Sequence, residues 1–219
     1  MITLALDAST YTGTVVIFRD RDVVAEGQSH MRGAEREELM PTVAAALDEA
    51  GVSPRDIQRV VCGAGPGSFT SLRIAASIAK GLALGAGCPL FAAPSLALIP
   101  GSRPDLAPGP YLAVLDALRG QAYVAGYSLD ANGLVSEILP LRLEPVAEVE
   151  SLARAAGARA IGAGQPIEAA PHARGVARLE AMLVRDGPVS ISTWEPRYGR
   201  KAEAQAKWEA AHGRPLQTG

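Results

Sequence analysis

Cysteine and histidine are scarce in this 219-residue sequence. It contains two cysteines, Cys62 and Cys88, and three histidines, His30, His172 and His212. Two cysteines cannot form the disulfide framework of a small secreted domain, and their spacing does not match a zinc site. The histidines are far apart, so no pair at i and i+4 can place two imidazoles on one helix face. We therefore expect a reduced protein with no metal site of its own.

The sequence also lacks a large excess of either charge sign, and it has no long hydrophobic run. The 21 basic residues, only three of them lysines, face 23 acidic ones, for a formal net charge of −2. An independent nucleic-acid binder needs a concentrated basic surface, which this balance does not favour. No apolar run approaches the roughly 20 residues needed to cross a bilayer. The N-terminal segment has no basic leader and reaches Asp7 early, so we expect a cytoplasmic protein without a membrane partner.

The composition that is present suits a folded α/β protein. Hydrophobic residues make up 48% and charged residues 20% of the chain, which is typical of a globular core and not of disorder. Residues 100–110 hold four prolines and two glycines and are predicted to be an irregular linker. This linker divides the chain into an expected N-terminal lobe, residues 1–102, and a smaller C-terminal lobe with a tail, residues 103–219.

The order of predicted elements recurs in the two parts. Each begins with three short β-branched or aromatic strands, and a helix and a further strand follow. In order, the expected strands cover 2–6, 13–18, 23–28, 59–64, 89–92, 111–117, 122–128, 134–139 and 158–161, and the expected helices cover 34–50, 71–84, 95–99, 145–156 and 175–185. The recurrence predicts a two-lobed α/β fold of the actin and sugar-kinase type, ribonuclease H-like in each lobe, with an abbreviated second lobe.

A glycine-rich turn precedes the second long helix, in the segment GAGPGSFTS at residues 63–71. Glycines allow close backbone approach, and a helix N-terminus favours anions. The segment nevertheless lacks the lysine of a P-loop, the third glycine of a dinucleotide fingerprint and the flanking glycines of a nucleophile elbow. A tight structural turn and an anion site that uses Gly67 and Ser68 are both open interpretations.

The helix after this turn is apolar on almost all sides, with a thin polar strip through Arg73, Ser77 and Lys80. A helix of this kind is buried on most sides. One side of the helix is expected to cover the sheet. The small alanines of the helix would let a partner approach the other side closely. A wholly internal core helix is the alternative interpretation.

These motifs resemble the TsaB (YeaZ) family, which contains paralogues of TsaD, the catalytic subunit in tRNA threonylcarbamoyladenosine synthesis. The resemblance starts at LALDAST, residues 4–10, and is most specific in GPGSFT, residues 65–70, followed by Arg73. It continues in LDALRGQAY, residues 115–123, and ends weakly at EPRY, residues 195–198. The chain departs from the family pattern at Ser71, where glycine is usual.

The resemblance implies a non-catalytic subunit that binds and activates TsaD for threonylcarbamoylation of adenosine 37 in tRNA. TsaE would be a further partner, tRNA would be met only through the complex, and the same surface could support a homodimer when TsaD is absent. No cofactor of its own is expected, and ATP or ADP would lie only at the complex interface. The residues expected to form the partner interface are Leu39, Val43, Leu47, Leu72, Arg73, Ala76, Ala79 and Lys80. Arginine in place of Ala76 or Ala79 is predicted to abolish TsaD binding.

Asp7, Ser9 and Thr10 follow the first strand and are candidates for contact with a nucleotide, together with Gly67 and Ser68. Asp116 ends the first strand of the second lobe in the same way. For Asp7 the favoured interpretation is an Asx turn that caps backbone amides. Two other functions remain open at this point: an actin-fold ATPase that acts on its own, and a small-molecule sensor that uses the cleft between the lobes.

Overall fold

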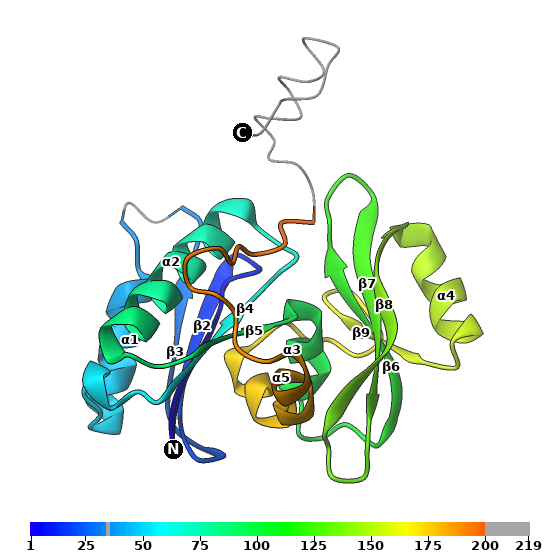
Figure 1. Cartoon of the computed structure of the whole chain (residues 1–219). Coiled ribbons are helices and arrows are strands. Elements are labelled where there is room, and N and C mark those ends of the chain that lie inside the picture. The colour runs from blue at the N-terminus through cyan, green and yellow to red at the C-terminus, as the bar shows by residue number, and fades with distance from the viewer. Residues whose placement is uncertain (34–35, 200–219) are drawn as a thin grey trace.

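Two β-sheets lie side by side and form the two lobes of the computed structural model, which describes residues 1–33 and 36–199 (Figure 1). The first sheet has five strands in the order β3-β2-β1-β4-β5, and the second has four in the order β8-β7-β6-β9. In both sheets the first strand pairs antiparallel with the second and parallel with a later strand. The predicted two-lobed actin-like fold is confirmed, with fewer strands in the second lobe.

The first sheet is built from short, mostly buried strands. They are β1 (Ile2–Asp7), β2 (Thr12–Arg19), β3 (Asp22–His30), β4 (Arg59–Gly63) and β5 (Leu90–Ala93). Because β1 and β4 are buried on both faces, they read as continuous apolar runs without alternation.

The helices α1 (Leu39–Ala50) and α2 (Phe69–Ala86) cover the outer face of the first sheet, and a short 3₁₀ turn (Pro54–Asp56) precedes β4. In the described chain α1 begins at Leu39, later than the predicted start at residue 34. Pro41 therefore lies in the first turn, where a missing N–H costs no intrahelical hydrogen bond. Gly51 and Gly87 end the two helices in the left-handed conformation.

The second sheet contains β6 (Gly109–Asp116), β7 (Gln121–Leu129), β8 (Val135–Pro145) and β9 (Arg159–Gly162). A 3₁₀ turn (Val146–Glu148) leads into α4 (Val149–Ala155), which covers its outer face. The turn predicted between the second and third strands is present, since the Gly133 N–H donates to the Asp130 carbonyl at 3.0 Å.

A single apolar core fills the space between the two sheets. Helices α3 (Ser95–Gly101) and α5 (Glu180–Asp186) lie there with a 3₁₀ segment (Ala173–Arg178), which replaces the first part of the predicted helix 175–185. Buried side chains of both sheets, among them Phe18 and Tyr111, belong to this one cluster. A partly buried ion pair between Arg59 and Glu180, at 3.0 Å, joins the first sheet to α5.

The predicted linker 100–110 is irregular only in its middle. Pro100 and Gly101 complete α3, and Gly109 and Pro110 begin β6. Proline is tolerated at a strand start, where its missing donor need not break the ladder. Among the described helices, none combines the length and the apolar composition needed to span a bilayer.

Candidate functional site

Asp7 lies at the end of β1 and is fully buried. One carboxylate oxygen accepts hydrogen bonds from the Ser9 N–H at 3.0 Å and the Ser9 hydroxyl at 2.7 Å, and the other accepts from the Ser95 hydroxyl at 2.5 Å. Burial raises the pKa of Asp7, although the hydrogen bonds from Ser95 and Ser9 oppose the shift. The predicted Asx turn is therefore confirmed.

The glycine-rich turn packs directly on this carboxylate. A Cβ on Gly63 would lie 1.9 Å from an Asp7 carboxylate oxygen, and a Cβ on Gly67 would lie 2.1 Å from the Ser9 carbonyl oxygen. The Ser68 N–H donates to that same carbonyl at 2.8 Å, and the Gly65 N–H donates to the Ser95 hydroxyl at 3.0 Å. Close backbone contact within the protein thus accounts for these glycines.

The five residues predicted to contact a nucleotide or anion come together in the structure. Asp7 and Ser9 are buried, whereas Thr10, Gly67 and Ser68 are half-buried. The Thr10 hydroxyl donates to the Thr12 carbonyl, and the Ser68 hydroxyl accepts from Ser71. These contacts are internal to the chain, and nucleotide contact stays a prediction.

The side chains chosen from the sequence as a partner interface need correction. Six of them are buried in the first lobe, with exposed fractions of 5% or less: Leu39, Val43, Leu47, Leu72, Ala76 and Ala79. They contact the protein's own core and leave no surface for a partner. Arginine in place of Ala79 would therefore test folding and not binding. The alternative of a wholly internal helix is wrong for α2, because its other side is exposed.

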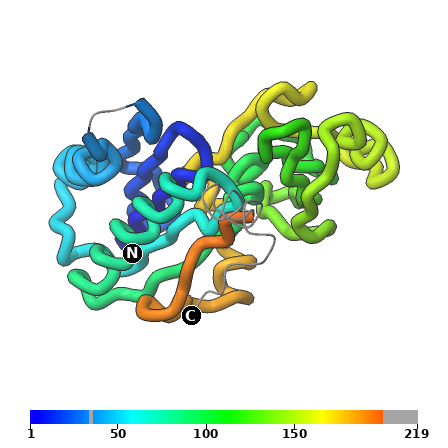
Figure 2. Tube along the Cα trace, turned by 90° about the horizontal axis from the view of Figure 1, so that it is seen from above, coloured from blue at the N-terminus to red at the C-terminus, as the bar shows by residue number. Residues whose placement is uncertain are grey.

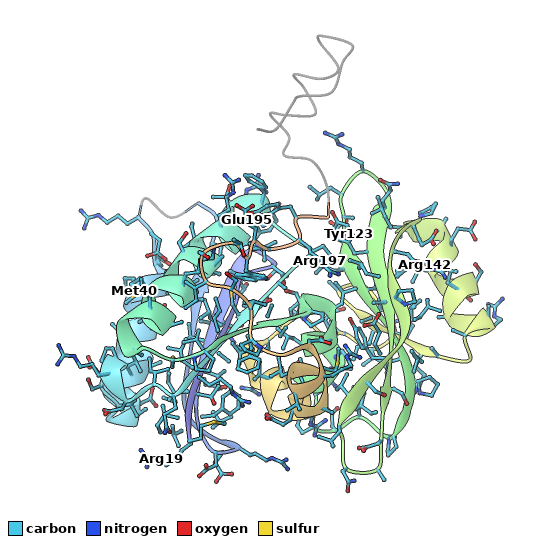
Figure 3. The ribbon with its side chains drawn as sticks, in the orientation of Figure 1. Arg19, Met40, Tyr123, Arg142, Glu195 and Arg197 are labelled. Atoms are coloured by element: carbon cyan, nitrogen blue, oxygen red, sulfur yellow. The ribbon has the colours of Figure 1, made fainter. Side chains whose placement is uncertain are left out.

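The outward side of α2 carries small side chains around one large one. Ser77, Gly81 and Gly85 are exposed, and Leu84 is 72% exposed. A Cβ on Gly81 or Gly85 would meet nothing within 4 Å. On the neighbouring α1, Met40 is 40% exposed and lies at the outer edge of the lobe (Figure 3).

A C-terminal strap, residues 188–199, returns from α5 to the first lobe and lies beside α2 (Figure 2). The Val189 N–H donates to the Leu90 carbonyl at 2.8 Å. Near the end of the strap, the Tyr198 ring packs against Phe69 at an angle of 48°, with centroids 4.5 Å apart. Its hydroxyl accepts a hydrogen bond from Arg73 at 3.2 Å.

The two remaining predicted interface residues lie against this strap. The Arg73 guanidinium lies 4.2 Å from the centre of the Phe69 ring, and the Lys80 ammonium lies 5.9 Å from the Trp194 ring. Sequence periodicity did not reveal the strap, because the segment is irregular. The sequence signals in this segment were its aromatic residues and the weak family motif EPRY at residues 195–198. The end of the expected tail, residues 200–219, lies outside the described residues.

A cleft of about 630 Å³ lies between the lobes. The first lobe contributes the turn at 64–66 and the end of β5, the second contributes β7 and β8, and the strap closes one side. Among the described residues, no group of three or more histidine, cysteine or acidic side chains is arranged to hold a metal ion. His30 is exposed, and His172 contacts Gln28 at 3.3 Å.

Comparisons with known proteins bear on this geometry. The family model described as "TsaD: tRNA N6-adenosine threonylcarbamoyltransferase" matches residues 32–167. The chain is 32% identical over 140 residues to the tRNA threonylcarbamoyladenosine biosynthesis protein TsaB of Bacillus subtilis, covering 64% of this chain and 60% of that protein. It is 36% identical over 132 residues to TsaB of Escherichia coli, covering 60% and 57%.

A solved structure from Pseudomonas aeruginosa, described as an uncharacterized protein with similarity to peptidase YEAZ, superposes with a TM-score of 0.76. It is 25% identical and covers 91% of this chain and 99% of that one. The family match spans more than half of the sequence, so the chain belongs to the TsaD family. The resemblance to TsaB (YeaZ) is confirmed, and the matched regions span about 60% of the length of these curated relatives.

Proposed function

We propose that this protein is a non-catalytic subunit in the synthesis of threonylcarbamoyladenosine in tRNA, and that it binds and activates TsaD. The names of the curated relatives and the family match support a role in this modification. The dispersed histidines of the described chain support an accessory role, because the metal-holding helical pair expected of a TsaD-like catalyst is missing there.

The outward side of α2 is the surface that we propose binds TsaD, and its exposed glycines are the main support. A glycine inside a helix lowers stability by roughly 0.5–1 kcal/mol relative to alanine. Gly81 and Gly85 fill no tight space in the monomer, because a Cβ at either position would be free of contacts. Close approach of a helix from another subunit would use this room, and the exposed Leu84 supplies apolar contact area at the same place.

A substitution at Gly81 tests the proposal without disturbing the interior. Arginine at this position has space in the monomer, so the Gly81→Arg variant is expected to fold and to lose TsaD. We expect binding to fall at least about tenfold, because a bulky charge at the centre of an interface blocks close packing. Calorimetric titration with purified TsaD and nucleoside analysis of tRNA from the reconstituted reaction give the two measurements.

Ala155→Arg is the matched control, since Ala155 is exposed on α4 at the far side of the molecule. It is expected to bind TsaD as the parent does. Undiminished complex formation by folded Gly81→Arg would refute the α2 surface. Threonylcarbamoyl transfer by the purified protein without TsaD would refute the accessory role.

In this proposal, TsaE and a nucleotide bind only at the junction between this protein and TsaD. Asp7 supports that restriction, because its carboxylate oxygens are already occupied by Ser9 and Ser95 in the monomer. ATP or ADP is thus expected to bind the assembled complex in preference to the isolated chain. The tRNA would be contacted through the same complex.

A further inference from the structure

The inter-lobe cleft has the dimensions of a small-molecule site and is not part of the α2 surface. Its volume of about 630 Å³ lies within the range of roughly 300–1,000 Å³ that is usual for ligand pockets. Apolar side chains line the part near the first lobe, among them Pro66, Pro94 and Leu96, and Trp194 on the strap adds an aromatic surface.

Charged side chains line the remaining wall, and one pair of them is already satisfied. Arg185 and Asp186 bind each other through two contacts, at 2.6 and 3.0 Å. Glu137, Glu195 and Arg197 line the same cleft and form no ion pair within the described chain. Charge also acts between Glu137 and Arg185 and between Arg197 and Asp186, without direct ion pairs. The cleft wall thus holds one negative and one positive group, Glu137 and Arg197, that have no direct ionic partner in the described chain.

Tyr127 supplies a polar group that is nearly enclosed. The residue is 2% exposed and lines the cleft, and its hydroxyl makes no hydrogen bond to another described residue. It pairs across the strands with Glu137, so the hydroxyl and this carboxylate lie on neighbouring strands. Burial and the Glu137 charge raise the pKa of Tyr127, which keeps the hydroxyl protonated. No fully buried side-chain polar atom of the described chain lacks a hydrogen-bond partner, so this unpaired hydroxyl is accessible from the cleft, where a ligand group can bind it.

Arg197 is held at the cleft by its own backbone. Its N–H donates to the Ala64 carbonyl at 2.8 Å, and its carbonyl packs where a side chain on Gly65 would otherwise lie. Figure 3 shows Arg197 and Glu195 on the strap between the two lobes. The backbone of Arg197 is therefore fixed at the cleft, and its exposed side chain starts from a defined point beside the lining.

We propose that this cleft binds a small amphipathic zwitterion, of the class of apolar amino acids and short apolar peptides. Glu137 and the Tyr127 hydroxyl oxygen would hold the ammonium group, Arg197 would hold the carboxylate, and the apolar body would lie against Pro66, Leu96 and Trp194. Three carboxylates against two guanidinium groups in the lining disfavour a polyanion such as a nucleoside triphosphate. The proposal rests on no part of the proposed partner function.

The fluorescence of Trp194 gives a direct test on the purified full chain. The Trp208→Phe variant makes Trp194 the single tryptophan, since the sequence contains two. Leucine and leucyl-leucine are titrated as probes, with calorimetry on the same solutions to register binding that leaves the indole unchanged. Saturable binding of leucine assigns the site to free amino acids, and tighter binding of leucyl-leucine assigns it to peptides.

Analogues and variants separate the two charged contacts. Leucinamide lacks the carboxylate and N-acetyl-leucine lacks the ammonium, and each is expected to bind about tenfold more weakly or worse, as for loss of a charged hydrogen bond. Arg197→Gln is expected to weaken leucine binding to a similar extent and to leave leucinamide unchanged. Arg119→Gln, outside the cleft, is the control. Absence of saturable binding by both methods, equal binding of the analogues, or preference for ADP would overturn the proposal.

Discussion

The first strand of each sheet ends at an aspartate, but the two aspartates differ in burial and in hydrogen bonding. Asp7 is fully buried and holds three hydrogen bonds from Ser9 and Ser95. Asp116 is exposed and accepts one, from the Leu118 N–H at 2.7 Å. In the first lobe the glycine-rich turn closes over the aspartate. The two aspartates occupy equivalent positions in the repeated topology. The buried one stabilises the turn around it, and the exposed one makes a single local hydrogen bond.

The largest expected effect comes from filling the space between Gly63 and Asp7. The Gly63→Ala variant would place a methyl group 1.9 Å from the Asp7 carboxylate oxygen that accepts the Ser95 hydrogen bond. Because neither strand can move easily, we expect a loss of about 3 kcal/mol in the free energy of unfolding, at the upper end for overpacking. Urea unfolding measures it.

Gly81→Ala is the matched control, because the new methyl group would meet nothing. It is expected to be neutral or stabilising by about 0.5–1 kcal/mol. Equal unfolding free energies for the two alanine variants would show that the Asp7 carboxylate is not held as described.

A smaller effect is expected from the paired substitutions Asp7→Asn and Asp116→Asn. The amide nitrogen of asparagine cannot accept a hydrogen bond, so one buried contact of Asp7 is lost, at a cost of about 1–3 kcal/mol near pH 5. At the exposed Asp116 the amide oxygen still accepts, and the change is expected to stay within about 0.5 kcal/mol. Similar losses at both sites would remove the difference between the lobes.

The smallest expected effect is a change with pH in the unfolding free energy that Asp7→Asn loses relative to the parent. Folding raises the pKa of Asp7 through burial, so the native state holds this proton more tightly than the unfolded chain does. That contribution to stability is complete below the unfolded pKa, about 3.9, and is lost as the pH rises through the raised native value. Asparagine does not titrate, so the difference in unfolding free energy between parent and variant should narrow as the pH rises above this range. A gap that widens would reverse the assigned sign.

Most strands and helices were predictable because their patterns are local. The apolar run at β1 and the stripe of α1 each depend on a few neighbouring residues. Which side of α2 is buried and which is exposed was not predictable, since the alanines at 76 and 79 and the glycines at 81 and 85 are all small. Only the position of the sheet shows which of them are buried.

The candidate sites were predictable only in part. Asp7, Ser9 and the glycine-rich turn were singled out by residue type, and the structure brings them together. The strap and the cleft depend on contacts between residues more than 50 positions apart, such as Ala64 with Arg197 and Arg73 with Tyr198. No periodicity in the sequence reports such contacts.

The apolar interior that the two sheets share has a consequence for how the chain can be divided. Phe18 and Val61 from one lobe and Tyr111 from the other are covered by the same helices. A fragment cut within residues 102–108 would leave one side of its sheet bare, and such a surface promotes aggregation. The molecule has two lobes in its topology, yet it is indivisible as a folding unit.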